Sequence, residues 1–206
     1  MRFRSISSAP NTRQADKWFD SDLAFHRLYP VDIQMLARRH WTPLHIARLA
    51  SQFLAQHSRA RILDIGSGAG KFCLASAYYK PQAQFTGVEQ RIHLVDIAES
   101  AKGILDLNNL EFVHANFTQI DFRSFNAFYF YNSFYENLIT EDRIDESIDY
   151  SSELYHYYCR FLFQKLEEMQ PGTRLVTYHS LEDEIPPSYE LKETHAEGLL
   201  KCWEKK

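Results

Sequence analysis

Along most of this chain, short apolar runs alternate with apolar residues in helical spacing. The short runs predict strands at residues 61–65, 84–89, 110–114, 127–131 and 174–178. Apolar residues three or four positions apart predict helices at residues 71–79, 94–105 and 154–169. Strands that alternate with helices pair in parallel and connect through right-handed crossovers. The pattern therefore predicts an α/β fold built on a mostly parallel sheet.

The last segment departs from this rhythm. Two further strands are expected at residues 189–195 and 199–203. Only residues 196–198 separate them, which is too short for a crossover helix, so this pair must be antiparallel. We therefore expect a seven-stranded, mostly parallel sheet whose last strand is antiparallel, with helices on both faces.

A helical segment precedes the sheet. Residues 15–57 favour helices, and one of these should begin at Thr42 and Pro43, because threonine can cap a helix and proline suits its first position. The apolar face of that helix is formed by Ile46, Leu49, Ala50, Phe53 and Leu54. These patterns divide the chain into an N-terminal helical cap or extension, residues 1–58, and an α/β domain, residues 59–206.

Composition and charge narrow the class of protein. Hydrophobic residues make up 45% of the 206 residues and charged residues 24%, which is ordinary for a globular domain. The net charge of −4 argues against a dedicated nucleic-acid binder, and we interpret the basic residues at 38–40 and 59–61 as ordinary surface charge. No apolar run approaches the roughly 18 residues of a membrane span, and no apolar stretch follows Arg2 and Arg4 as in a signal peptide. We expect no membrane partner.

The three cysteines, Cys73, Cys159 and Cys202, are far apart in the sequence. No CxxC pair is present, so the sequence predicts no metal site. Free thiols persist in a reducing compartment, which makes the cytoplasm the expected location.

The strongest chemical signal is the stretch Asp64-Ile65-Gly66-Ser67-Gly68-Ala69-Gly70, which follows the first predicted strand and opens a helix. Glycines in such a turn permit a tight bend and a close approach of the backbone to a ligand. The helix N-terminus favours an anionic or carboxylate group. A dinucleotide fingerprint would need a glycine where Lys71 stands, and a phosphate-binding loop would need Ser or Thr in place of Phe72.

This stretch resembles the first motif of the class I, Rossmann-like S-adenosylmethionine-dependent methyltransferases, an acidic residue and Gly-x-Gly-x-Gly after strand one. Asp64, Gly66, Gly68 and Gly70 carry the resemblance. The closing antiparallel strands are also typical of the family, so the resemblance covers about residues 60–205. It implies an enzyme with S-adenosylmethionine as its cofactor, held by these four residues and by Ser67 between them.

Two further segments follow in the family's order. Glu89 ends the second strand, where the family has an acidic residue that binds the ribose, and a carboxylate can accept two strong hydrogen bonds. We assign the adjoining Gln90 to the same cofactor site. Asn116 follows the third strand, where the family often has an aspartate that accepts from the adenine amino group, and Phe117 can flank the purine. Asn116 could also be a simple turn residue.

The fourth strand ends in Tyr131-Asn132-Ser133-Phe134-Tyr135. In the family, this strand end faces the transferred methyl group and its acceptor. Amino-group methyltransferases that act on bases carry Asn/Asp-Pro-Pro-Tyr/Phe there, and this chain matches the first and last positions without the prolines. The resemblance favours a nitrogen acceptor, implies Asn132 and Tyr135 as catalytic residues, and places Tyr131 beside the cofactor sulfonium.

The leading functional hypothesis is methyl transfer to an unidentified acceptor, a small molecule or a protein. A cofactor-binding module without catalysis and a nucleic-acid base methyltransferase are the alternatives, while the glycine spacing disfavours an NAD-dependent oxidoreductase. His40 is a further candidate, because N-terminal segments cap the site in many relatives. The sequence predicts neither a particular acceptor nor an oligomeric state.

Overall fold

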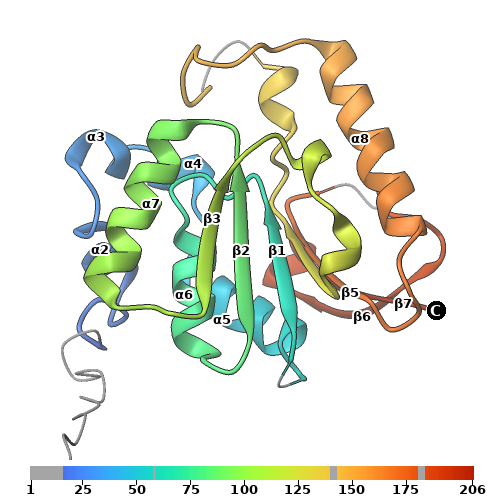
Figure 1. Cartoon of the computed structure of the whole chain (residues 1–206), viewed down its shortest axis with the longest axis horizontal. Helices are drawn as coiled ribbons and strands as arrows, with labels where there is room; N and C mark the ends of the chain where they lie inside the picture. Colours follow the sequence, from blue (N-terminus) through green and yellow to red (C-terminus); the bar gives the residue numbers. More distant parts are fainter. Residues whose placement is uncertain (1–15, 58, 140–142, 181–183) are drawn as a thin grey trace, which may run out of the picture.

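The computed structural model describes residues 16–57, 59–139, 143–180 and 184–206. Its centre is a seven-stranded sheet with the strand order β3-β2-β1-β4-β5-β7-β6 (Figure 1). The strands are β1 (Arg61–Ile65), β2 (Gln84–Glu89), β3 (Leu110–His114), β4 (Ala127–Phe130), β5 (Arg174–Tyr178), β6 (Tyr189–His195) and β7 (Leu200–Lys205). Only β7 runs against its neighbours, because it is inserted between β5 and β6. The predicted mostly parallel sheet with an antiparallel last strand is confirmed.

Two apolar layers cover the sheet (Figure 1). One face carries α5 (Leu44–Leu54), α6 (Lys71–Tyr79) and α7 (Ile92–Leu105). The other face carries α8 (Ser152–Glu167) and the 3₁₀ turns η1 (Phe117–Gln119) and η2 (Phe122–Ser124). These turns, rather than an α-helix, connect β3 to β4. None of the helices in the described part of the chain has the length and hydrophobicity that a membrane span requires.

Three short helices, α2 (Asp22–His26), α3 (Val31–Gln34) and α4 (Ala37–His40), precede α5 and pack in the apolar layer that also contains α5 and α6. Phe25 of α2 is fully buried in the same apolar cluster as α5, α6 and α7. The N-terminal helices are therefore packed into the core of the α/β domain rather than held apart from it.

The predicted capping role of Thr42 is wrong. Pro43 occupies the N-cap position of α5, and its side chain forms no capping hydrogen bond. Thr42 Oγ1 instead forms a hydrogen bond of 2.8 Å with the hydroxyl of Tyr129 in β4. Because Tyr129 is almost completely buried, its hydroxyl needs a partner inside the protein, and this requirement outweighs the local helix signal.

A buried cation ties the N-terminal helices to the helix that follows the glycine loop. Lys71 Nζ, at the first turn of α6, contacts Asp22 Oδ1 and lies 3.1 Å from His26 Nε2. Asp22 Oδ1 also accepts from the backbone N–H of Leu44, at 3.0 Å. Burial lowers the pKa of Lys71, and its ion pair with Asp22 opposes that shift. The N-terminal segment, which also lines the cavity described below, is therefore anchored to the helix that directly follows the glycine loop.

Candidate active site

A cavity of about 680 Å³ opens at the carboxyl ends of the parallel strands. This edge is where open α/β sheets bind their ligands, and the volume lies within the roughly 300–1,000 Å³ usual for cofactor and substrate sites. The walls come from the loop after β1, from the ends of β2, β3 and β4, and from residues 131–139 and 144–150. Leu36, His40 and Trp41 of the N-terminal segment complete the lining. His40, a candidate from the sequence, thus lies in the lining of this cavity.

The glycine loop has different physical tasks at its different positions. Gly66 has φ +74°, and a Cβ there would lie 2.6 Å from Cβ of Ser133, so the loop after β4 can pack against it only if it is glycine. Gly70 similarly lies against the ring of Phe112. Gly68 has φ +54° and nothing within 4 Å of the position of a Cβ. Gly68 thus leaves open space on the cavity side, as a bound cofactor requires.

Asp64, Ser67 and Gly70 do not belong to the cavity lining. Asp64 is 3% exposed within β1, and its Oδ2 accepts from Cys73 Sγ at 3.3 Å. Ser67 Oγ is buried, lies close to Gly87, and has no hydrogen-bond partner among the described residues. Asp64 and the Ser67 hydroxyl thus lie on the buried side of the loop, and the contacts of these three residues with a cofactor stay a prediction.

The buried position of Asp64 predicts a pH-dependent stability. Burial raises the pKa of this carboxyl to about 7, from an ordinary value near 3.8. A raised folded pKa contributes stability below the unfolded pKa that is lost as the pH rises through the folded pKa. Against wild type, Asp64→Asn should therefore gain stability between about pH 4 and pH 7, by roughly 2–4 kcal/mol, and keep the gain above pH 7.

Urea unfolding of the cofactor-free protein at pH 5, 7 and 8 measures this gain. Asp32→Asn, on the exposed surface of α3, should show no such trend. A wild-type stability that rises relative to Asp64→Asn over the same pH range would contradict the prediction.

Glu89 lines the cavity at the end of β2 and is 5% exposed. Its Oε2 accepts from the backbone N–H of Gly68 at 3.1 Å. Its Oε1 accepts from the backbone N–H and from Nη1 of Arg91, at 3.0 and 3.4 Å. A carboxylate offers about four acceptor positions, so the geometry fits a ribose that replaces the longest of these bonds.

Gln90 and Phe117 also line the cavity, but Asn116 does not. Asn116 Oδ1 caps η1 by accepting from the backbone N–H and the hydroxyl of Thr118, at 3.0 and 2.8 Å. Its amide nitrogen donates to Gln90 Oε1 and to the hydroxyl of Tyr158, at 2.8 and 2.7 Å. The turn role considered for Asn116 is thus observed. Its oxygen therefore has no free position for an adenine amino group. Its amide nitrogen orients Gln90, which does line the cavity.

The strand-four segment brings its aromatic residues to the cavity. Tyr131, Asn132 and Tyr135 all line it, and Tyr135 is 48% exposed. Phe134 is buried and packs on Phe117, with ring centroids 4.9 Å apart. Asn132 has φ +41°, a left-handed conformation that asparagine tolerates better than most residues. Such strained positions concentrate at functional sites.

Two charged residues of the cavity lining, Arg91 and Glu136, were not found by the sequence reasoning. Arg91 is 6% exposed, lines the cavity, and forms ion pairs with Glu89, Glu136 and Asp145. Glu136 Oε1 also lies 3.7 Å from His40 Nδ1. Arg91 directly follows Glu89 and Gln90, and this proximity was the one available signal. Glu136 and Asp145 lie more than 40 residues further along the chain, and no local pattern reveals such a distant pairing.

Outside the cavity, Glu193, His195 and Cys202 bring one donor atom each to within 4.8 Å of one another. His195 Nε2 lies 3.1 Å from Glu193 Oε2, and burial raises the pKa of Cys202 to about 12. This group arises because β6 and β7 pair in antiparallel register, with Glu193 opposite Cys202. The CxxC spacing rule behind the prediction of no metal site cannot detect such a pairing.

The comparisons with known proteins identify the family of this chain. Residues 56–205 match the family model described as a methyltransferase domain. The chain belongs to this family, which confirms the class expected from the sequence, a Rossmann-like methyltransferase with S-adenosylmethionine as its cofactor.

Among curated proteins, the chain is 46% identical over 54 residues to a tRNA (guanine-N(7)-)-methyltransferase of Synechococcus sp. (strain JA-3-3Ab), covering 26% of this chain and 23% of that one. It is 38% identical over 65 residues to ribosomal RNA small subunit methyltransferase G of Helicobacter pylori, covering 29% of this chain and 36% of that one. The chain therefore spans only about a quarter to a third of the length of these relatives.

Among solved structures, TrmN from Thermus thermophilus superimposes with a TM-score of 0.60 at 19% identity, over 84% of this chain and 52% of that one. An RNA methyltransferase from Salinibacter ruber, in complex with S-adenosyl-L-homocysteine, gives a TM-score of 0.51 at 20% identity, over 80% of this chain and 92% of that one. At these identities the likeness confirms the fold.

Proposed function

We propose that this protein transfers the methyl group of S-adenosylmethionine to a nitrogen atom of a small molecule or a protein side chain. The observation that carries the proposal is Asn132, held in a left-handed conformation at the end of β4 and facing the cavity. Among the residues that the structure describes, none forms a hydrogen bond with its side-chain amide. That amide is therefore available to a ligand.

Different residues of the cavity bind the cofactor and orient the acceptor. Gly68 and Glu89 hold the cofactor, and the bound cofactor supplies an activated methyl group for in-line displacement by the acceptor nitrogen. The acceptor reacts as a neutral amine after it loses a proton to solvent, and the Asn132 oxygen accepts a hydrogen bond from its N–H and so aims the nitrogen lone pair at the methyl carbon. As the N–C bond forms, the C–S bond breaks and S-adenosylhomocysteine leaves. The faces of Tyr131 and Tyr135 stabilise positive charge in the same space. Leu36, His40 and Trp41 of the N-terminal cap restrict which acceptor enters.

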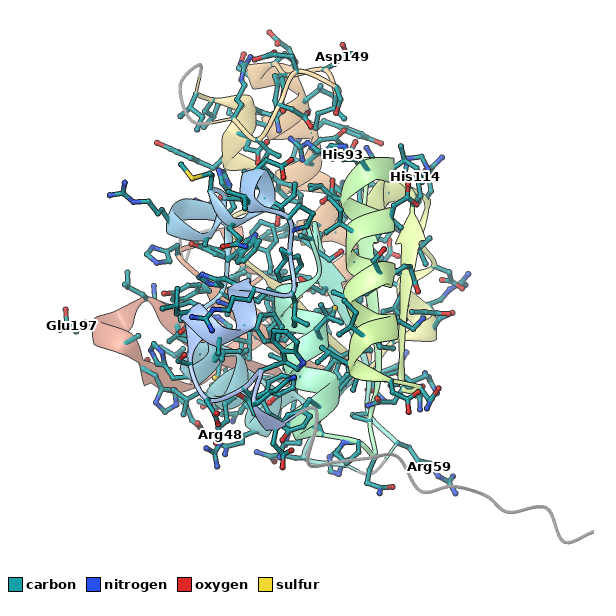
Figure 2. All side chains as sticks on the ribbon, turned by 90° about the vertical axis from the view of Figure 1, so that its left-hand side faces the viewer. Arg48, Arg59, His93, His114, Asp149 and Glu197 are labelled. Carbon is teal, nitrogen blue, oxygen red and sulfur yellow. The ribbon has the colours of Figure 1, made fainter. Side chains whose placement is uncertain are left out.

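The charge around the cavity favours an amine over a phosphate-rich acceptor. Of the described residues between 131 and 153, five are acidic and one is an arginine. Asp149 lines the cavity, whereas Arg59, of the predicted basic pair, lies at the opposite end of the molecule (Figure 2). A negative surface repels nucleic-acid phosphates, while it attracts cationic groups.

A nucleic-acid base is the second candidate acceptor, because the relatives named above are tRNA and ribosomal RNA methyltransferases. In that case, basic groups outside the cavity lining must offset its acidic charge. The cytoplasm, where such acceptors occur, remains the proposed location.

Transfer of a labelled methyl group into fractionated cell extract tests the proposal. We expect label in the small-molecule or protein fraction, on nitrogen. Label confined to the nucleic-acid fraction would establish the second candidate instead. Binding of the cofactor without transfer to any fraction would identify a non-catalytic binding module.

The ribose contact gives a separate prediction. Glu89→Gln keeps the size of the side chain but removes the charge that strengthens both ribose hydrogen bonds, so cofactor affinity should fall about tenfold, or about 1.4 kcal/mol. Calorimetry with S-adenosylhomocysteine measures the change.

Glu111→Gln, which alters a carboxylate of β3 outside the cavity lining, is the matched control and should leave affinity unchanged. Equal affinity of Glu89→Gln and wild type, together with earlier melting of the cofactor-free variant, would make Glu89 a structural residue only.

A further inference from the structure

We infer that Arg91 is a positioning residue that couples cofactor binding to the ordering of the acceptor side of the cavity. The inference rests on the proposed ribose contact of Glu89, and it does not depend on the chemical identity of the acceptor. Arg91 is the N-cap residue of α7, and its guanidinium lies between the end of β2 and the segments that follow β4.

The guanidinium of Arg91 connects the turn after β4 with residues 145–150 on the acceptor side of the cavity. Nη2 donates to Glu136 Oε2, next to the strand-four residues, and to the hydroxyl of Tyr150 at 2.7 Å. Nε donates to Asp145 Oδ1 at 3.2 Å. The Tyr150 hydroxyl in turn bonds to the backbone oxygen of Asp145. One nearly buried cation thus fixes three points of the wall that faces the acceptor.

The same guanidinium also contacts Glu89 on the cofactor side, and this is the longest of its hydrogen bonds. Its contact with Glu89 Oε1 is 3.4 Å, against 3.1 Å for the Gly68 N–H and 3.0 Å for the Arg91 backbone N–H on the same carboxylate. These three bonds occupy three of about four acceptor positions. A ribose that donates two bonds must displace one, and the guanidinium bond is the longest and weakest.

Cofactor binding therefore breaks the hydrogen bond between Glu89 and the guanidinium. The side chain then interacts entirely with Glu136, Asp145 and Tyr150. Glu136 extends the effect to His40 of the N-terminal segment, 3.7 Å away. Because binding couplings are reciprocal, an ordered acceptor side must also strengthen cofactor binding by the same factor.

Hydrogen exchange with and without S-adenosylhomocysteine tests the inference on the full chain. The amides to follow are those of Asn137 and Leu138 in the turn after β4, and that of Ser147, which bonds to Asp145 Oδ1 at 2.9 Å. In wild type we expect about tenfold slower exchange when the ligand is bound. In Glu136→Gln we expect bound ligand to slow exchange less than twofold, and we expect affinity for the ligand to be about fivefold lower than in wild type.

Two further variants make the result specific. Glu146→Gln alters an exposed carboxylate on the same segment, paired with Arg143 rather than with Arg91, and should behave as wild type. Arg91→Lys keeps the charge but cannot span four partners, so it should resemble Glu136→Gln.

Equal protection in wild type and Glu136→Gln would overturn the inference, as would no protection in a wild-type protein that binds the ligand. Failure of wild type to bind the ligand at all would overturn the proposed cofactor site as well. Ligand binding and hydrogen exchange require no methyl acceptor, so both results are independent of the label-transfer assay.

Discussion

Gly68→Val should reduce affinity for S-adenosylhomocysteine more than 100-fold, which corresponds to about 2.7 kcal/mol or more. The backbone at Gly68 has φ +54°, and the space where a Cβ would lie is empty of protein atoms within 4 Å. That space is the part of the cavity that the cofactor must enter if it is to reach Glu89. A branched side chain would fill it. Calorimetry on the purified variant measures the loss.

Valine in a left-handed conformation also costs folding energy, roughly 1–2 kcal/mol, so a matched control is needed. Gly172, in the turn before β5, has φ +83°, has nothing within 4 Å of its Cβ position, and lies outside the cavity lining. Gly172→Val should show a similar fall in melting temperature and unchanged ligand affinity. Retained binding in a folded Gly68→Val protein would place the cofactor elsewhere.

The sheet and the glycine loop could be predicted because their signals are local. A short apolar run that ends in Gly-x-Gly-x-Gly specifies a buried strand and a tight turn within ten residues of sequence. The predicted three-residue connection, residues 196–198, alone required an antiparallel pair of strands, and the structure confirms that β7 is antiparallel to β5 and β6. Local stereochemistry dominates in each of these elements.

The Arg91 network could not be predicted, because its partners meet only after the chain has folded. Glu89, Arg91 and Glu136 come from β2, the start of α7 and the turn after β4. The same reason explains Thr42 and Asn116. Each has a polar side chain with a plausible local or ligand role, and each is bonded to a group supplied by the fold, Tyr129 for Thr42 and Tyr158 for Asn116. Buried polar groups take the partners that tertiary packing provides.

Asn132→Gly should lower turnover about 100-fold and leave cofactor affinity nearly unchanged. Glycine suits the left-handed backbone at this position, φ +41°, so the substitution removes the side-chain amide without adding strain. If the amide orients the acceptor nitrogen, its loss lets the nucleophile rotate away from the line of attack, and correct orientation supplies a large part of the rate. Single-turnover transfer to the labelled acceptor fraction, with calorimetry on the cofactor, separates the two effects.

Asp106→Gly provides the control for Asn132→Gly. Asp106 has φ +53° at the end of α7, outside the cavity lining, so this change gives the same relief of backbone strain and should leave turnover unchanged. Lower cofactor affinity in Asn132→Gly at normal single-turnover rates would move Asn132 to the cofactor side. Unchanged turnover and unchanged affinity would leave Asn132 as a turn residue, and the acceptor would then have to be oriented by other groups in the cavity, of which Tyr135 is the most exposed aromatic residue.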